Sequence, residues 1–264
     1  MSEVWSCGGG TQSAAIAALI VQGKLPKPDL AVIADTGREA SETWRYFNGV
    51  LCPQLRSVGV DLVRLPHAFH RPEMVDDGDE VWNTVDLYSG KDKNTIVMPM
   101  FTNKTGKPGK LPKYCSNEWK SRPVDRYIRK QGLESGNIWI GFSSDEPERL
   151  RAHNPKAKWN HSYPLFDQRM TRADCIALVE KMGWGTPPRS ACWMCPYRSD
   201  AEWLHLKSTD PNDFNRAVAL EQSLQIRDPD VYFHDSCEPL EDVDFNEGQE
   251  DLFSKPCASG MCFT

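Results

Sequence analysis

Hydrophobic and polar positions along the first 65 residues predict strands that alternate with helices. Three short apolar runs have the pattern of strands buried on both faces of a parallel sheet, and the stretches between them have helical spacing. Strands that alternate with helices predict an α/β fold with a parallel sheet covered on both faces. The expected strands are Val4–Cys7, Leu30–Asp35 and Asp61–Leu65, and the expected helices are Gln12–Gln22 and roughly Glu39–Val58.

This periodicity is lost over residues 66–114, where Gly, Pro, Lys and Asp accumulate. So long an irregular stretch inside a compact domain is usually functional, and we expect a lid or substrate loop. Helical spacing returns over Ser116–Gln131, and Asn137–Phe142 is the next expected strand. We therefore expect an α/β domain over residues 1–165. A mostly helical or irregular region over residues 166–264, packed on the same core, would carry further cysteines and an acidic tail.

Two helix starts in this second region are marked by their capping residues. Thr171 and Asp174 have the spacing of a capping box, and the apolar positions that follow place Cys175 on the buried face of a helix. Asp210 followed by Pro211 predicts the start of another helix.

The composition is that of a soluble globular protein. Of the 264 residues, 39% are hydrophobic and 26% are charged. No apolar run approaches the ~20 residues of a membrane span, and no signal peptide opens the chain, so we expect a cytoplasmic protein without a membrane partner. The nine cysteines are odd in number and irregular in spacing, which indicates thiol or metal chemistry in a reducing compartment.

Charge is distributed unevenly along the chain, although the net charge is only −6. The segment from Asp235 to Asp251 carries eight acids and no Lys or Arg. A basic run is either a solvated face or an electrostatic funnel for a polyanion such as a nucleotide or a nucleic acid. The basic run here comprises Lys104, Lys107, Lys110, Lys113, Lys120, Arg122, Arg126, Arg129 and Lys130.

A glycine-rich segment lies between the first expected strand and the first expected helix. Consecutive glycines let the backbone approach an oxyanion closely, and the helix that follows points its free N–H groups at the same place. The segment therefore predicts a phosphate site, with an ordinary strand-to-helix turn as the alternative. It reads Ser6-Cys7-Gly8-Gly9-Gly10-Thr11-Gln12-Ser13.

A second turn, Asp35-Thr36-Gly37, follows the second expected strand. Ligands of open α/β sheets bind beyond the carboxyl ends of the strands, so we expect this turn and the glycine-rich segment to line one crevice.

Cys192-Trp193-Met194-Cys195 is the clearest metal-like motif. Two thiolates separated by two residues can hold one ion, as in zinc and iron–sulfur sites, and the same spacing also serves redox dithiols. The six histidines form no metal spacing, and we expect no catalytic role for them.

The two turns together resemble those of the PP-loop ATP pyrophosphatases, specifically the branch related to phosphoadenosine phosphosulfate (PAPS) reductase. The resemblance implies a Rossmann-like, adenine nucleotide alpha hydrolase-like fold that binds ATP with Mg²⁺. Gln12 stands where an acid is usual in such loops, so the way in which Mg²⁺ would be held is open. The nucleotide-binding residues that it implies are Ser6, Gly8, Gly9, Gly10, Gln12, Ser13, Asp35, Thr36, Gly37 and Arg126.

Two further segments carry the resemblance. Ser143–Arg149 resembles the block after the fourth strand of the family, which implies catalytic roles for Asp145 and Arg149, and Lys120 belongs to a segment that resembles its Cys-Thr-x-x-x-Lys motif. The Cys-x-x-Cys-Pro block is similar to that of phage and bacterial members.

Related thiolation enzymes hold a [4Fe–4S] cluster with three cysteines, which implies Cys115, Cys192 and Cys195 here. Cys262 or Cys257 is a possible fourth ligand, and Zn²⁺ is the alternative metal.

Such a protein would hydrolyse ATP at the α–β bond and adenylate an acceptor for sulfur transfer. The basic run suggests a nucleic acid acceptor such as tRNA or DNA, with a sulfur donor such as a cysteine desulfurase. A PAPS or adenylylsulfate reductase that uses cysteine thiols is one alternative, although the C-terminal Glu-Cys-Gly block of such reductases is absent. A non-catalytic, metal-stabilised nucleotide-binding module, for example in a phage or defence system, is another.

Overall fold

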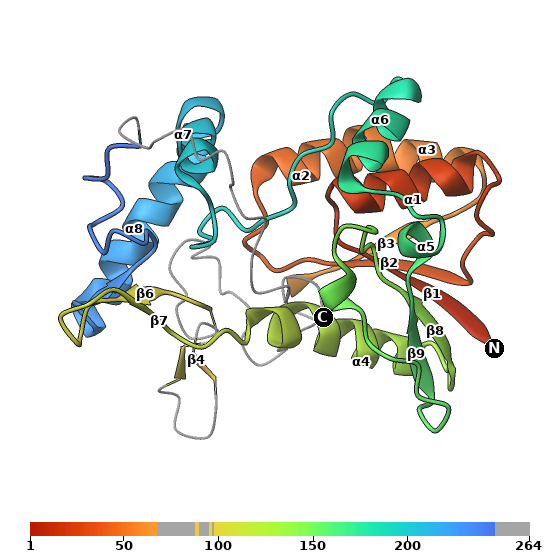
Figure 1. Ribbon diagram of the computed structural model, residues 1–264, viewed down its shortest axis with the longest axis horizontal. Helices are drawn as coiled ribbons and strands as arrows, with labels where there is room; N and C mark the ends of the chain where they lie inside the picture. The colour runs from red at the N-terminus through yellow and green to blue at the C-terminus, as the bar shows by residue number, and fades with distance from the viewer. Residues whose placement is uncertain (68–87, 90–94, 97, 246–264) are drawn as a thin grey trace. The chain divides into compact units, whose positions relative to one another are not determined.

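The computed structural model describes residues 1–67, 88–89, 95–96 and 98–245, and the described residues fall into two compact units (Figure 1). The first unit comprises Met1–His67 and Trp119–Ser190. The second comprises the described residues of 88–118 together with 191–245. The chain therefore passes between the units after His67, at residues 118/119 and at residues 190/191.

The first unit is built on a parallel sheet of five strands in the order β3-β2-β1-β8-β9. Each neighbouring pair is parallel, and β1 lies between β2 and β8. The α/β fold with a parallel sheet is thus confirmed. The strands are β1 (Ser2–Cys7), β2 (Leu30–Ala34), β3 (Leu62–Leu65), β8 (Gly136–Trp139) and β9 (Trp159–Ser162).

Helices cover both faces of this sheet, as the alternation of strands and helices predicts (Figure 1). Trp5 and Ile33 face α1 (Thr11–Val21), α3 (Cys52–Ser57) and α6 (Arg172–Lys181) in one apolar core. On the other face, neighbouring strand positions pack against α4 (Arg122–Lys130) in a second core. The remaining helical segments are α2 (Ser41–Tyr46), the π-helix η1 (Phe47–Leu51), the π-helix η5 (Asn117–Ser121), the 3-10 helix η6 (Pro147–Arg149) and α5 (Pro164–Asp167).

The boundary expected at residue 165 falls inside the first unit. The reason is that Cys175 and Val179 of α6 belong to the same buried cluster as α1. Thr171 and Asp174 form the predicted capping box, with each side chain accepting from the backbone N–H of the other. Cys175 is fully buried, as predicted.

The second unit consists of two helices and short antiparallel strands. Trp203 and Phe214 pack with Phe245 in an aromatic core, with ring centroids 6.1 to 6.5 Å apart. The helix expected to start at Pro211 does so. The elements are α7 (Asp200–Thr209), α8 (Pro211–Arg227), a sheet in the order β10-β6-β7 made of β10 (Val231–Tyr232), β6 (Phe101–Thr102) and β7 (Gly109–Lys110), and the pair β4 (Tyr88–Ser89) and β5 (Thr95–Ile96).

Much of the segment expected to form a lid, including residues 68–87 and 90–94, lies outside the described residues. The lid therefore stays a prediction. In the part of the chain that the structure describes, no helix is long and apolar enough to cross a membrane.

Candidate functional site

The glycine-rich loop joins the carboxyl end of β1 to the first turn of α1. Gly9 has φ +78°, a conformation that glycine adopts without a steric penalty. Gly10 occupies the N-cap position of α1 without a side-chain cap, and the first turn contains no acidic residue. The amide of Gly8 donates to Ser13 Oγ at 2.8 Å, which folds the loop back onto the helix. The positive end of α1 is therefore not neutralised by a carboxylate of its own first turn, as an anion site requires.

Neighbouring atoms lie close to two glycines of this loop, so a larger residue at either position would have to displace them. A Cβ atom on Gly9 would lie 3.1 Å from both Ile33 Cδ1 and Thr43 Cγ2. A Cβ atom on Gly10 would lie 3.0 Å from the amide nitrogen of Ser190. The loop is thus packed between the second strand, α2 and the segment that ends the first unit.

The turn after β2 lies at the same edge of the sheet, because β1 and β2 are parallel neighbours. The Asp35 carboxylate accepts from the amide of Gly37 at 2.7 Å and from Arg64 Nε at 2.8 Å. Arg64 in turn stacks on the Trp44 ring, with 3.8 Å between Cζ and the ring centroid. Gly37 has φ +68°, and a Cβ atom there would lie 3.0 Å from the His67 ring. The carboxylate of Asp35 thus organises the turn, in which Thr36 is buried and Gly37 is exposed.

A buried acid that the sequence analysis assigned to no site connects three segments near the glycine loop. The Glu39 side chain is 3% exposed, accepts a hydrogen bond from Ser190 Oγ, and lies 3.6 Å from Lys120 Nζ. The Lys120 side chain is itself mostly buried. Nothing in the local pattern around Glu39 indicated burial, because its partners are about 80 and 150 residues away along the chain.

Arg149 and Gln12 meet at the carboxylate of Glu146. Arg149 forms an ion pair with Glu146, and its guanidinium lies over the Phe142 ring at 4.1 Å. Gln12 Nε2 donates to the other Glu146 oxygen at 3.2 Å, which ties the first turn of α1 to this segment. The predicted catalytic residue Arg149 is therefore connected through Glu146 to Gln12, in the first turn of α1.

Three further predicted site residues have the following positions. Asp145 accepts from the amide of Arg172 at 3.2 and 3.3 Å, at the first residue of α6, so its carboxylate caps that helix. Arg126 is exposed on α4. Ser6 lies within β1, paired with Val32.

The Cys7 thiol, at the end of β1, is buried. Burial raises its pKa to about 12, although a hydrogen bond to Gly9 lowers it. Burial likewise raises the pKa of Cys175 to about 12. Both thiols therefore stay protonated at neutral pH, which supports structural roles.

In the second unit, Cys192 and Cys195 lie in a tight turn anchored by the two residues between them. The amide of Cys195 donates to the carbonyl of Cys192 at 3.1 Å. Trp193 and Met194 are 2% and 1% exposed, whereas both cysteines are partly exposed. The guanidinium of the buried Arg198 donates to the Cys192 carbonyl at 3.2 Å, which places a positive charge next to the turn.

The predicted metal site is not formed by the described residues alone. Among them, no three His, Cys, Asp or Glu side chains come together in an arrangement that could hold a metal ion. Cys115 is partly exposed in the same unit as Cys192 and Cys195, but the three do not form such a group. The other candidate ligands, Cys257 and Cys262, lie outside the described residues.

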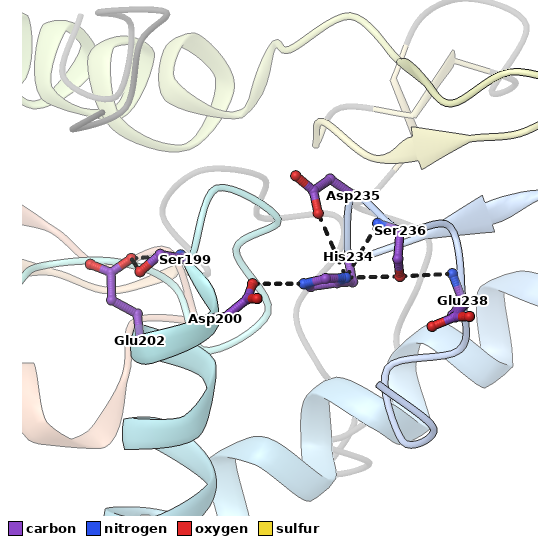
Figure 2. Close-up of polar contacts among 7 residues, drawn as sticks. All are labelled: Ser199, Asp200, Glu202, His234, Asp235, Ser236 and Glu238. Atoms are coloured by element: carbon purple, nitrogen blue, oxygen red, sulfur yellow. Dashed lines mark hydrogen bonds and ion pairs between the residues drawn. The ribbon is translucent and has the colours of Figure 1, made fainter. Parts of the chain in front are cut away.

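A hydrogen-bonded chain in the second unit was not expected from the sequence (Figure 2). His234 Nε2 lies 3.0 Å from Asp200 Oδ1, and Nδ1 lies 2.9 Å from Ser236 Oγ. Because the amide of Ser236 also donates to Nδ1, at 3.2 Å, the proton of the neutral ring belongs on Nε2 and is donated to Asp200. Glu238 donates its amide to Ser236 Oγ at 3.3 Å, so the hydroxyl belongs to a local turn. The arrangement joins the segment after β10 to the start of α7.

The described residues form an α/β fold with a glycine-rich loop at the carboxyl edge of a parallel sheet. No protein-family model and no curated protein matches the chain. Among solved structures, the chain is similar to PAPS reductase from Candida auris in its phosphate complex, with 12% identity and a TM-score of 0.46 over 73% of this chain and 82% of that one. It is also similar to the U34-tRNA thiolase NcsA from Methanococcus maripaludis with its [4Fe–4S] cluster, with 12% identity and a TM-score of 0.44 over 98% of this chain and 79% of that one. These are the two kinds of enzyme that the sequence motifs resemble.

Proposed function

We propose that the protein is an enzyme that binds ATP at the glycine loop and cleaves it between the α and β phosphates. An oxygen of an acceptor attacks the α-phosphorus, the bond to the β-phosphate breaks, and pyrophosphate leaves. A sulfur nucleophile then displaces AMP from the activated carbon, so that the acceptor becomes thiolated.

The observation that carries this proposal is the packing of the loop between β1 and α1. Two glycines there are closely packed by their neighbours, the helix start has no side-chain cap, and its first turn has no acid. Amide groups at such a helix start bind phosphate oxygens through hydrogen bonds and the helix dipole.

Two cationic side chains of the first unit offer positive charge that could stabilise the pyrophosphate leaving group. Lys120 and Arg149 are each held by one carboxylate near the loop, and both are largely buried. Fixed cations in a partly dry site stabilise the charge that develops on pyrophosphate. Mg²⁺ accompanying ATP would be held mainly by phosphate oxygens and water, because Gln12 offers no carboxylate in the loop.

The second unit offers surfaces that suit an acceptor and a sulfur nucleophile. Lys110 and Lys113 place their ammonium groups 5.3 and 5.5 Å from the centroid of the Tyr197 ring, so an aromatic side chain lies among basic ones. Bases and phosphates of a nucleic acid are bound by such combinations, which supports tRNA or DNA as the acceptor. A [4Fe–4S] cluster on Cys192, Cys195 and a further cysteine is the cofactor that the family resemblance implies, and the adenylation step does not require it.

The experiment that tests this function is ATP binding to matched glycine variants, measured by calorimetry. Gly10→Ala should weaken ATP binding at least tenfold, since about 3 Å to a backbone nitrogen forces the loop apart. Gly49→Ala is the control, because a Cβ atom there meets nothing within 4 Å. Absence of adenine nucleotide binding by the unmodified protein would refute the proposal.

A reductase reaction is the second candidate, favoured by the pair of partly exposed thiols beside Arg198. Two assays distinguish these candidates. The first reaction releases pyrophosphate from ATP when an acceptor is present, whereas the reductase reaction releases sulfite from adenylylsulfate or PAPS when thioredoxin is present.

A further inference from the structure

Glu39 is held by a hydroxyl and an ammonium group, two kinds of group that also bind phosphate oxygens. One carboxylate oxygen accepts from the hydroxyl of Ser190, and the other lies 3.6 Å from the ammonium of Lys120. The side chain is 3% exposed, so water contributes little to its solvation. A phosphate oxygen entering this place would use the same hydroxyl and the same ammonium.

The environment of Glu39 adjoins the glycine loop through both of its partners. Ser190 lies directly behind the loop, because Cβ atoms on Gly9 and Gly10 would lie 3.7 Å from its Oγ and 3.0 Å from its amide nitrogen. Lys120 is close enough to Cys7, the last residue of β1, for its charge to lower the pKa of that thiol, against the larger effect of burial. The carboxylate, the ammonium and the loop amides therefore occupy one neighbourhood.

Electrostatics gives this arrangement a definite consequence. The interaction between two charges a few ångströms apart is several times stronger in a buried, partly dry site than in water. A carboxylate there neutralises Lys120 when the loop is empty and repels phosphate oxygens when the loop is filled.

We propose that Glu39 is a built-in competitor for the anion site, which weakens the hold of the loop on pyrophosphate and thereby hastens its release. The inference rests on the proposed function, since it requires that the glycine loop bind phosphate groups. It adds a residue that limits product affinity and that forms no bond to the reacting atoms.

Calorimetric titration with inorganic pyrophosphate tests the proposal on three full-length proteins. Glu39→Gln keeps the size of the side chain and an oxygen for the Ser190 hydroxyl but removes the charge. It should bind pyrophosphate about tenfold or more tightly than the unmodified protein. Asp61→Asn is the matched control with the same change of charge, because Asp61 is 84% exposed and precedes β3 at the opposite edge of the sheet. Its pyrophosphate affinity should equal that of the unmodified protein.

Steady-state kinetics gives a second readout that a structural role would not produce. In Glu39→Gln, KM for ATP and kcat should both fall, and added pyrophosphate should inhibit at lower concentration. A loss of kcat with an unchanged or raised KM would contradict the proposal.

The outcomes distinguish failure of the inference about Glu39 from failure of the proposed function. If the unmodified protein binds pyrophosphate and Glu39→Gln binds it equally or less tightly, the inference is wrong and the proposed function stands. If none of the three proteins binds pyrophosphate or ATP, both are wrong.

A second variant covers the case in which Glu39→Gln does not fold. Glu39→Ser removes the charge, keeps a polar oxygen at the position and leaves Lys120 in place. Its pyrophosphate affinity should also rise about tenfold over that of the unmodified protein. Equal or weaker binding of pyrophosphate by this variant would show that Glu39 does not oppose the anion.

Discussion

At the scale of single residues, the buried acid Glu221 organises the segment that follows β10. Its two carboxylate oxygens accept from the amides of Phe233 and Leu240, each at 2.6 Å. The side chain is 1% exposed. Burial raises the pKa of Glu221 from 4.5 to about 7, while the two amides and His234 act in the opposite direction.

The raised pKa predicts how stability depends on pH. Between pH 4.5 and 7 the folded protein binds more protons at Glu221 than the unfolded chain does, so the contribution to stability is complete below pH 4.5 and is lost as the pH rises through about 7. The loss is roughly 3 kcal/mol. The loss is measured by urea unfolding at a series of pH values. At each pH, the free energy of unfolding of Glu221→Gln is subtracted from that of the unmodified protein. Exposed Glu134→Gln should leave the pH profile unchanged, and a flat difference curve for Glu221→Gln would contradict the prediction.

Replacement of Arg149 should slow the cleavage of ATP without greatly weakening ATP binding. Arg149→Lys keeps the charge but loses the planar group that lies over Phe142 and pairs with Glu146. We expect pyrophosphate release from ATP to slow by about 100-fold, with ATP affinity changed far less. Arg56→Lys, which alters an exposed pair with Asp61, is the control. Equal rates for the two variants would remove Arg149 from the catalytic machinery.

At the scale of elements, the sequence predicted the regular parts of the first unit well. The three early strands, α1, the capped start of α6 and the first turn of α8 lie where apolar spacing and capping residues placed them. These signals are local, since each depends on residues within one or two turns of each other. Local patterns could not show the π-helical turns at Phe47–Leu51 and Asn117–Ser121 or the short strands around Phe101.

The candidate site likewise has parts that local sequence patterns could predict and parts that they could not. The glycine loop was predictable because its chemistry lies in consecutive residues. The burial of Glu39 and the contact of His234 with Asp200 depend on residues distant in sequence, and no local pattern reports them. Asp145 was assigned a catalytic role from a motif, and only the fold shows it at the start of α6.

The capping box of α6 gives a prediction at this scale. Thr171→Ala removes the oxygen that accepts from the amide of Asp174 at 3.2 Å. The free energy of unfolding should fall by about 1 kcal/mol, and ATP affinity should not change. Thermal unfolding measures the first and calorimetry the second. Thr186→Ala, an exposed threonine outside the helix, should cost less, and an equal loss would mean that the box contributes nothing specific.

At the scale of the whole molecule, two units share one chain that passes between them after His67, at residues 118/119 and at residues 190/191. The glycine loop belongs to the first unit, and the Cys-x-x-Cys turn belongs to the second. Lys120 comes directly after the second of these crossings, and Ser190 comes directly before the third. Glu39 contacts both of these residues, so one buried acid holds the first-unit ends of two crossings.

The cysteine turn gives the prediction for the whole protein. Protein purified without oxygen should show broad absorbance near ~400 nm and bound iron if the thiols hold an iron–sulfur cluster. Cys192→Ser with Cys195→Ser should abolish both, whereas Cys175→Ala should retain them, since that thiol lies in the core. A colourless protein with one bound zinc would exclude the cluster, and would leave ATP cleavage to be tested separately.

The burial of Trp193 and Met194 limits which amino-acid substitutions the Cys-x-x-Cys turn can accept. Positions between two ligands of a metal turn are often free to vary, because only the ligand atoms matter. Here each intervening side chain fills space in the interior, so a saturation library should be depleted at 193 and 194 as deeply as at the flanking thiols. In cells starved of metal, depletion at 193 and 194 should persist, because it depends on packing and not on a bound ion.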